Sequence, residues 1–473
     1  TGDRHVAIGN GALSSNTVGC RNIAIGYNAL QDNVDGDFNV GIGYASLANT
    51  TVNDNTGIGY LSLLTNTTGA SNTAIGSNSL SSNTTGASNV AVGKEALANN
   101  TTANNNTAVG FESLQANTTA SQNTAIGFCS ALSTTTGNNN TSVGSQSLRD
   151  NTTGYCNTAF GCGSLANNET AFCNTALGTR TMVTNTTGSC NTAVGTNALL
   201  LNTTGVRNTA IGLDSLGANT TSSNNTAVGA NALDANTTGD SNIAIGYAPL
   251  FTNTTGTNNV AVGNLALCAN TTATSNTAVG DSALRSNTTG TQNTAIGKNT
   301  MYYNTSGGYS VAVGNNALQT QTTGANNVAV GRTALAALTT GTRNTVVGGS
   351  YALGAGAATT TGYHNVYIGN DAGGTNTTGS GNAVLGTEAF KLSTTGSHNT
   401  AIGDKALCSA TVSNANTAVG RNALYTLTTG ADNTAMGEQA LQANTTGYIN
   451  VAVGKNAMAA NTTGQGNVAI GGS

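Results

Sequence analysis

Apolar and polar residues recur along the whole chain with a fixed period of 17 residues. The repeating unit reads N-T-A-[IV]-G-x-x-A-L-x-x-N-T-T-G-x-x, and we number its positions 1 to 17 from the first Asn. Copies begin, for example, at Asn72, Asn89 and Asn106, and 28 copies start between His5 and Asn467. A fixed period indicates a stacked repeat architecture, rather than the roughly three compact domains that a length of 473 residues would otherwise favour.

Two steps depart from the period. The copy at 39–54 has 16 residues, and the step from Asn344 to Asn365 has 21. We expect the four extra residues to form a loop insertion near 350–360, at Gly354–Ala357, because a surface loop can bulge there without disturbing its neighbours.

The segment N-T-A-[IV]-G has the character of a short strand. Its second and fourth residues share one face, and Ile or Val at position 4 is expected in the core, while Ala74 and Gly76 would face away from it. Leu at position 9, such as Leu80, supplies a second core residue. Position 5 is Gly in all 28 copies, which predicts either a positive φ or a backbone too closely approached for any Cβ.

The N-T-T-G segment has turn chemistry, with a glycine expected to supply a left-handed conformation. Two short extended runs and two turns make one rung of a coil, so the sequence predicts an all-β fold, a parallel β-solenoid (β-roll) with one 17-residue repeat per rung. Stacked rungs would place Ile on Ile, Leu on Leu and Asn on Asn, about 4.8 Å apart. A helical solenoid is the competing interpretation, but 17 residues cannot hold two helices.

The columns of small residues at positions 3 and 5 suggest association between chains. Ala and Gly stay small and non-polar there in nearly every copy, and strands covered on both faces are a sign of burial. We therefore expect the chain's main partner to be itself, as a homotrimer or a filament, in a rod about 130 Å long.

The string N-T-A-I-G-x-x-A-L-x-x-N-T-T-G, nearly as in 72–86 and 191–205, resembles the repeats of long bacteriophage tail fibres and bacterial surface proteins. Its A-I-G core is similar to the head repeats of trimeric autotransporter adhesins, which are left-handed parallel β-rolls wound as trimers. The resemblance covers essentially the whole chain and implies a left-handed coil. The adhesin repeat is usually shorter and lacks the N-T-T-G turn, and no chaperone or anchor domain lies within this chain.

Composition narrows the range of functions. Charged residues make up 7% of the chain, the net charge is -4, and the 14 Lys and Arg are spread along its length, so we expect no nucleic-acid partner. The sequence has no run of about 20 apolar residues, so we predict no membrane span in this segment. Because the chain begins and ends within a copy, we interpret 1–473 as one continuous repeat array, a fragment of a longer chain.

The chain has few residues of the kinds that carry out catalysis. The histidines are His5, His364 and His398, and the 18 acidic residues are scattered over variable positions. No carboxylate or Cys shares the histidines' column at ligand spacing, and the N-T-T-G turn lacks the repeated Asp of calcium-binding rolls. The sequence therefore predicts no enzyme, no catalytic residue, no metal site and no cofactor.

Three of the eight cysteines form a pattern. Cys156, Cys173 and Cys190 occupy position 17 of consecutive copies, so they should stack at a spacing within the Cα range of a disulfide. We consider a disulfide between two of them, which would suit an extracellular setting, alongside simple tolerance of Cys at a variable loop position.

The Asn-Thr-Thr turn is also an N-glycosylation sequon, and we expect its asparagines to be exposed acceptors if the host glycosylates. Turn chemistry alone also explains the string. The candidate acceptors are Asn49, Asn66, Asn83, Asn100, Asn117, Asn151, Asn185, Asn202, Asn219, Asn236, Asn253, Asn270, Asn287, Asn376, Asn444 and Asn461.

These features favour a structural shaft of an extracellular or virion fibre, at a cell surface or on a virus, with mechanical reach and adhesion to a cell-surface or matrix receptor as its roles. One alternative is a self-assembling extracellular filament, N-glycosylated or not. Another is a β-solenoid that binds ice or a matrix. Paired threonines such as Thr84 and Thr85 are adjacent and sit in a turn, whereas an ice-binding face needs them at alternate strand positions.

Overall fold

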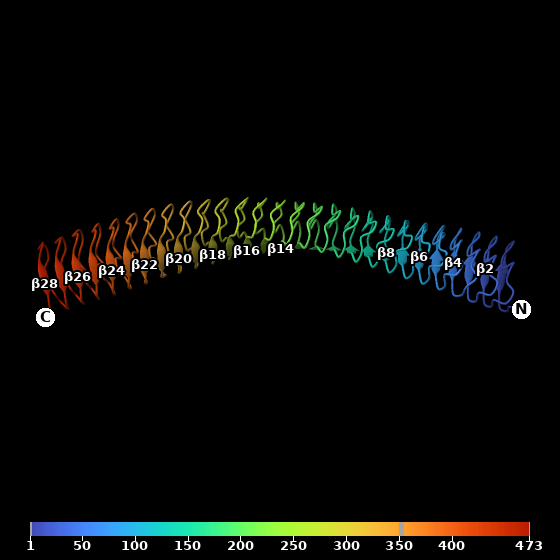
Figure 1. Ribbon diagram of the computed structural model, residues 1–473, viewed down its shortest axis with the longest axis horizontal. Coiled ribbons are helices and arrows are strands. Elements are labelled where there is room, and N and C mark those ends of the chain that lie inside the picture. Colours follow the sequence, from blue (N-terminus) through green and yellow to red (C-terminus); the bar gives the residue numbers. More distant parts are fainter. Residues whose placement is uncertain (1, 350–353, 473) are drawn as a thin grey trace. The chain divides into compact units, whose positions relative to one another are not determined.

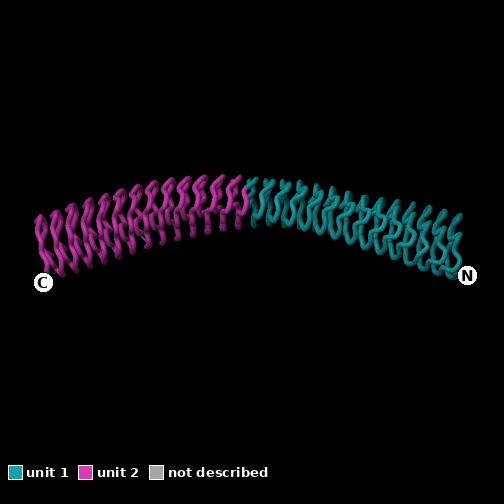
Figure 2. The backbone as a smooth tube through the Cα atoms, viewed as in Figure 1, with its two compact units in different colours: residues 1–238 teal, residues 239–473 magenta. Residues whose placement is uncertain are grey.

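The computed structural model describes residues 2–349 and 354–472. The chain forms two compact units, Thr1–Thr238 and Gly239–Ser473, which Figure 2 colours separately. Within each unit the backbone winds forward as a coil in which every turn is one copy of the repeat (Figure 1). We describe each unit by itself.

Each copy contributes one strand of three residues, at positions 2 to 4. The first unit contains β1 (Val6–Ile8), β2 (Ile23–Ile25), β3 (Val40–Ile42), β4 (Thr56–Ile58), β5 (Thr73–Ile75), β6 (Val90–Val92), β7 (Thr107–Val109), β8 (Thr124–Ile126), β9 (Thr141–Val143), β10 (Thr158–Phe160), β11 (Thr175–Leu177), β12 (Thr192–Val194), β13 (Thr209–Ile211) and β14 (Thr226–Val228).

The second unit continues the series in the same way. It contains β15 (Ile243–Ile245), β16 (Val260–Val262), β17 (Thr277–Val279), β18 (Thr294–Ile296), β19 (Val311–Val313), β20 (Val328–Val330), β21 (Thr345–Val347), β22 (Val366–Ile368), β23 (Ala383–Leu385), β24 (Thr400–Ile402), β25 (Thr417–Val419), β26 (Thr434–Met436), β27 (Val451–Val453) and β28 (Val468–Ile470).

Consecutive strands of a unit pair in parallel, with like positions facing one another. In β5 and β6, for example, Ile75 pairs with Val92 and Ala74 with Ala91. The same register holds across the short copy, where Ile42 pairs with Ile58. The predicted all-β parallel β-solenoid, with one repeat per rung and like side chains in vertical columns, is confirmed.

The rest of each rung is not a second strand, so the prediction of two extended runs per copy is wrong. Positions 7, 9 and 17 have positive φ, as at Asn78 (57°), Leu80 (49°) and Ser88 (59°). These left-handed residues alternate the direction of the amide groups. The Leu80 amide donates forward to the Ala96 carbonyl at 3.0 Å, whereas the Asn78 amide donates back to the Tyr60 carbonyl at 2.8 Å. Backbone hydrogen bonds therefore join successive rungs around the turn side as well as along the strands.

The strand faces the opposite way from our prediction. Ala74 is fully buried, whereas Ile75 is 38% exposed, and the same pattern holds along both units. Alanine at position 3 and leucine at position 9, such as Leu80, fill the core together with Ala or Ser at position 8. Placing position 4 in the core and the alanine outside it was wrong, although positions 2 and 4 do share one face. The predicted core role of Leu80 and its equivalents is confirmed.

The width of the coil explains this orientation. Gly57 occupies position 3 of its copy, and a Cβ added there would lie 3.0 Å from Leu47 Cγ. A methyl group thus already reaches the leucine column. In the copy with Tyr367 at position 3, Gly373 replaces the leucine at position 9, and its added Cβ would lie 2.9 Å from the tyrosine ring. Tyr367 is fully buried.

The invariant glycine at position 5 has both properties predicted for it. Gly76 has a φ of +135°, and a Cβ added to it would lie 2.5 Å from the carbonyl oxygen of Gly93. The glycine of N-T-T-G is different. Gly86 is not left-handed, and its added Cβ would meet the Ala103 carbonyl oxygen at 2.3 Å. The predicted left-handed glycine in this turn is therefore wrong, because the left-handed residue of the segment is position 17.

The two irregular copies keep the core columns in register. In the copy at 39–54, Thr50 takes the place of the position 12 asparagine, and the missing residue lies in the turn that follows. In the long copy, the Leu335 amide donates to the Ala355 carbonyl at 3.2 Å, so Gly354–Ala357 are ordinary members of the rung. Placing the extra residues at 354–357 was wrong. Residues 350–353, which belong to the predicted insertion near 350–360, lie outside the described residues.

Candidate interaction surface and side-chain columns

In each unit the outward face of the strands forms a regular surface. Position 4 is Ile, Val, Leu, Met or Phe in all 28 copies, and none of these side chains is buried. Ile126 is 40% exposed and Phe160 56%. Position 2 stands beside them and is Thr in 16 copies, Val or Ile in 11 and Ala383 in one. We call these two columns the strand face.

The asparagines at position 1 tie the strand to the opposite turn. The Asn72 Nδ2 donates to the Gly86 carbonyl across the rung at 2.8 Å, and its Oδ1 accepts from the backbone amide of Asn89 at 2.9 Å. Asn72 is fully buried. Because each of these side chains bonds within its own rung and to the next one, the column holds the coil closed and fixes the stacking register.

The asparagines of the sequon form a second buried ladder, at position 12. The Asn83 Nδ2 donates to Asn66 Oδ1 and to the Gly86 carbonyl, both at 2.8 Å, and Asn83 Oδ1 accepts from Asn100 Nδ2 at 2.8 Å. The expectation that these asparagines are exposed is therefore wrong for 14 of the 16 candidates, each with 0% exposure: Asn66, Asn83, Asn100, Asn117, Asn151, Asn185, Asn202, Asn219, Asn236, Asn253, Asn270, Asn287, Asn376 and Asn444.

The two remaining candidate acceptors differ from the others. Asn461 is half-buried in the last rung, and Asn49 is exposed because the short copy puts Thr50 into the ladder in its place. A sugar on a buried Nδ2 would break two hydrogen bonds and open the coil, so the glycosylation hypothesis now rests on Asn49. The 16-residue step at 39–54 was the signal in the sequence that distinguished this residue.

The three cysteines of position 17 do lie in one column. Cys156, Cys173 and Cys190 are exposed free thiols with left-handed backbones. Desolvation raises the pKa of the Cys173 thiol, and the charges of Cys156 and Cys190 add to the rise, as does a hydrogen bond with Cys156. Their proximity agrees with the predicted column, while the disulfide itself stays a prediction.

The histidines do not come together. His5 contacts Asn16 Nδ2 at 3.2 Å, and His364 contacts Arg343 at 3.3 Å. The backbone amide of His398 donates to the Ser380 carbonyl at 2.9 Å, two rungs from His364. Over residues 2–349 and 354–472, no group of three or more His, Cys, Asp or Glu side chains is arranged to hold a metal ion.

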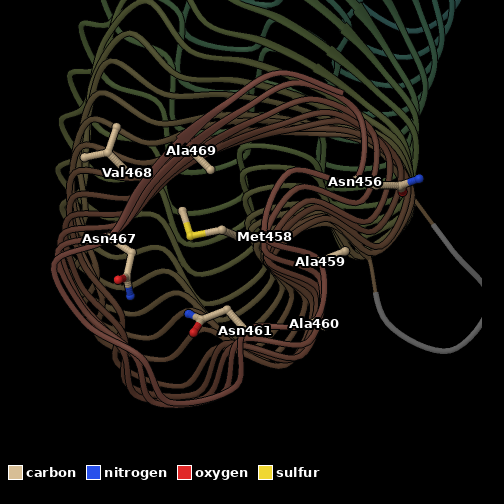
Figure 3. Close-up of a pocket in the computed structure, with 8 residues that line it drawn as sticks. All are labelled: Asn456, Met458, Ala459, Ala460, Asn461, Asn467, Val468 and Ala469. Atoms are coloured by element: carbon tan, nitrogen blue, oxygen red, sulfur yellow. The ribbon is translucent and has the colours of Figure 1, made fainter. Parts of the chain in front are cut away.

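One large hollow lies at the last rungs of the second unit. Figure 3 shows Met458, Ala469, Asn461 and Asn467 pointing into the interior of the coil there. These are positions 9, 3, 12 and 1, which the next rung covers in other copies. The hollow is therefore uncovered core and not a ligand site.

Nothing in the described part of the chain forms a helix long and apolar enough to cross a bilayer. Neither a protein-family model nor a curated protein matches the sequence.

Proposed function

We propose that the chain is the shaft of an extracellular or virion fibre, in which several chains of this sequence pack against one another along the strand face. The observation that carries this proposal is the apolar column at position 4 in each unit. A stack of nearly identical rungs holds its two ends at a fixed distance and transmits force between them. Such a stack suits a spacer between an anchor and a binding domain. The resemblance to tail-fibre and adhesin repeats supports the same role.

The size of the strand face argues for a partner of the same kind. With about 50 Å² of apolar surface left on each position 4 side chain, the 14 strands of the first unit expose on the order of 700 Å². That exceeds the apolar patch of a typical soluble monomer and is close to the share that each partner gives to a stable interface. A second chain of the same sequence has the same rung spacing, so the position 4 side chains of the two chains can interdigitate along the face. The chain association that we predicted from the alanine columns is now proposed for the opposite face.

Sedimentation of the full chain tests this proposal. We expect wild-type protein at about 10 µM to sediment as a multimer, and the triple variant Ile75→Lys, Val109→Lys, Val143→Lys to sediment as a folded monomer, because lysines on an exposed column leave the core intact. The matched control carries Thr85→Lys, Thr119→Lys, Thr153→Lys on the exposed turn and should stay multimeric. A monomeric wild-type protein would overturn the proposal.

Ice or matrix binding is the second candidate, because the structure shows outward threonines in a strand. Thr73 and Ile75 face outward together, and Thr56 and Ile58 stack on them in the preceding rung, whereas the following rung has Val90 and Val92. The two functions exclude each other on one surface, since a strand face that packs against another chain cannot bind ice. A thermal hysteresis measurement on monomeric protein, with a Thr73→Val, Thr107→Val, Thr124→Val variant as control, separates them.

The cysteine column supports the extracellular location. In an oxidising compartment we propose a disulfide between Cys173 and one of its neighbours, Cys156 or Cys190. Peptide mapping by mass spectrometry, without reducing agent, would find the linked pair in native fibres. Three reduced thiols in protein isolated from its source would contradict the proposal.

A further inference from the structure

A polar hollow lies on the turn side of the second unit, away from the strand face. It is lined by residues of three consecutive rungs: Ser282, Arg285, Asn299, Tyr302, Tyr303 and Gln319. Ser282 and Asn299 occupy position 7 of their copies, and Arg285, Tyr302 and Gln319 occupy position 10. The fold therefore brings two side-chain columns together around one Arg.

Arg285 is bound to an aromatic group instead of a carboxylate. Its Nη1 donates to the hydroxyl of Tyr302, and its guanidinium carbon lies 5.5 Å from the centre of that ring. Among the residues that the structure describes, no carboxylate pairs with Arg285. A guanidinium has five N–H donors, so the single bond to Tyr302 leaves donors for a further acceptor.

Two other basic residues at position 10 show what Arg285 lacks. Arg149 pairs with Asp150 at 2.6 Å, and Lys391 pairs with Glu388 at 2.8 Å and with Asp371 at 3.4 Å. The residue after Arg285 is Ser286, so the local carboxylate that neutralises Arg149 has no counterpart here. A bound carboxylate would complete the pair, with the two parallel hydrogen bonds that a guanidinium favours.

The neighbours of Arg285 indicate what carries that carboxylate. Tyr302 and Tyr303 meet edge to face, with ring centres 4.6 Å apart, and Tyr303 is 51% exposed. An exposed ring beside a hollow suits the C–H face of a sugar. The side chains of Asn299 and Gln319 are neutral and can both donate and accept, which suits sugar hydroxyls. The lining has one cation and several neutral polar groups. This charge suits a ligand with one negative charge per sugar better than a polyphosphate, which has several.

We infer that this hollow, lined by Arg285, Tyr303 and Gln319, binds a carboxylated sugar of the hexuronate class. The guanidinium binds the carboxylate, the tyrosine ring contacts the sugar face, and the amides bind hydroxyls. The inference does not depend on the association of chains along the strand face.

Calorimetric titration of the full chain with a hexuronate trisaccharide tests the inference, with the neutral hexose trisaccharide of the same linkage as comparison. We expect saturable binding of the acidic sugar and at least about tenfold weaker binding of the neutral one. Arg285→Gln should weaken acidic-sugar binding about tenfold, and Arg285→Lys should recover only part of it, because lysine keeps the charge and loses the fork. Tyr303→Ala should weaken binding of both sugars.

The matched control is Arg149→Gln, which removes an Arg from the same column whose carboxylate partner is already present. It should leave binding unchanged within about twofold. Melting curves of all variants should coincide with wild type, because these side chains lie on the surface of the coil. No binding of the acidic sugar, equal binding of both sugars, or equal loss in the Arg149 and Arg285 variants would overturn the inference.

Discussion

At the scale of single residues, the glycine of position 5 is the most constrained residue of the rung. Gly76→Ala would place a methyl group 2.5 Å from the Gly93 carbonyl oxygen at a φ of +135°. We expect it to destabilise the surrounding rungs by about 3 kcal/mol, from backbone strain and overpacking together. Hydrogen exchange of the β5 and β6 amides would measure the loss locally.

Gly86→Ala is the matched control for that substitution. Its methyl group would also be crowded, at 2.3 Å from the Ala103 carbonyl oxygen. Other copies nevertheless carry alanine at this position, as at Ala103 and Ala120, so the backbone can relax there. We expect a loss below about 1 kcal/mol. Equal losses in the two variants would show that backbone conformation does not explain why position 5 never varies.

The buried asparagine ladder predicts a pH-dependent variant. Asn83→Asp would put a carboxylate opposite Asn66 Oδ1 and the Gly86 carbonyl oxygen, both of which now accept from the Asn83 amide. Burial and the lost donors should raise the pKa of this carboxyl, so the folded chain binds its proton more tightly than the unfolded chain. The stability of the variant is then highest below the ordinary Asp pKa and falls as the pH rises above it.

Thermal melting between pH 4 and pH 8 measures this effect. We expect Asn83→Asp to cost about 3 kcal/mol more at pH 8 than at pH 4. Asn83→Leu is the control, because Leu338 and Leu427 are fully buried at the same position in other copies. It should destabilise the chain by a similar amount at both values of pH. A pH-independent Asp variant would mean that water reaches the ladder.

At the scale of the rung, core volume is shared between positions 3 and 9. Tyr367 is fully buried opposite Gly373, where other rungs have alanine opposite leucine. Tyr367→Ala alone should leave a cavity and cost about 3 to 5 kcal/mol. Adding Gly373→Leu should recover most of that loss, since Gly373 has a φ of +60° and Leu80 adopts 49° at the same position.

Urea denaturation of the two single variants and the double variant gives the coupling energy between the positions. Gly373→Leu alone should be destabilising, because its added Cβ already lies 2.9 Å from the tyrosine ring. Additive effects of the two substitutions would contradict the shared-volume account.

This exchange also shows what the sequence could and could not predict about the rung. The 17-residue period, the parallel register, the core leucine and the strict glycine all follow from aligning the copies of the repeat with one another. The orientation of the strand does not, because one face has Ile or Val beside Thr, the other has only Ala and Gly, and larger apolar side chains are usually the buried ones. The limited space opposite leucine favours alanine, and the pairing of Tyr367 with Gly373 is a trace of that limit in the sequence.

The candidate sites were predictable to a different degree. The column of Cys156, Cys173 and Cys190 followed from the period alone. The hollow around Arg285 did not, because it combines positions 7, 10 and 11 of three rungs. Left-handed residues such as Asn299 and Met301 bring the two columns together, and neither residue type favours that conformation strongly enough to predict it.

At the scale of the whole molecule, each rung contacts only its neighbours, so one complete copy should be removable. Deletion of 191–207 joins Cys190 to Asn208 and leaves every column of the first unit continuous. We expect the shortened protein to keep its circular dichroism spectrum and to melt within about 3 °C of wild type, since stability in such arrays is nearly a sum over rungs. Deletion of 191–198 removes β12 (Thr192–Val194) and the start of its turn, and the remaining part of that copy cannot close a rung. That variant should lose protease resistance near residues 174–225, while distant rungs keep theirs. If the two deletions were equally harmful, the 17-residue copy would not be the independent structural unit on which the proposed shaft depends.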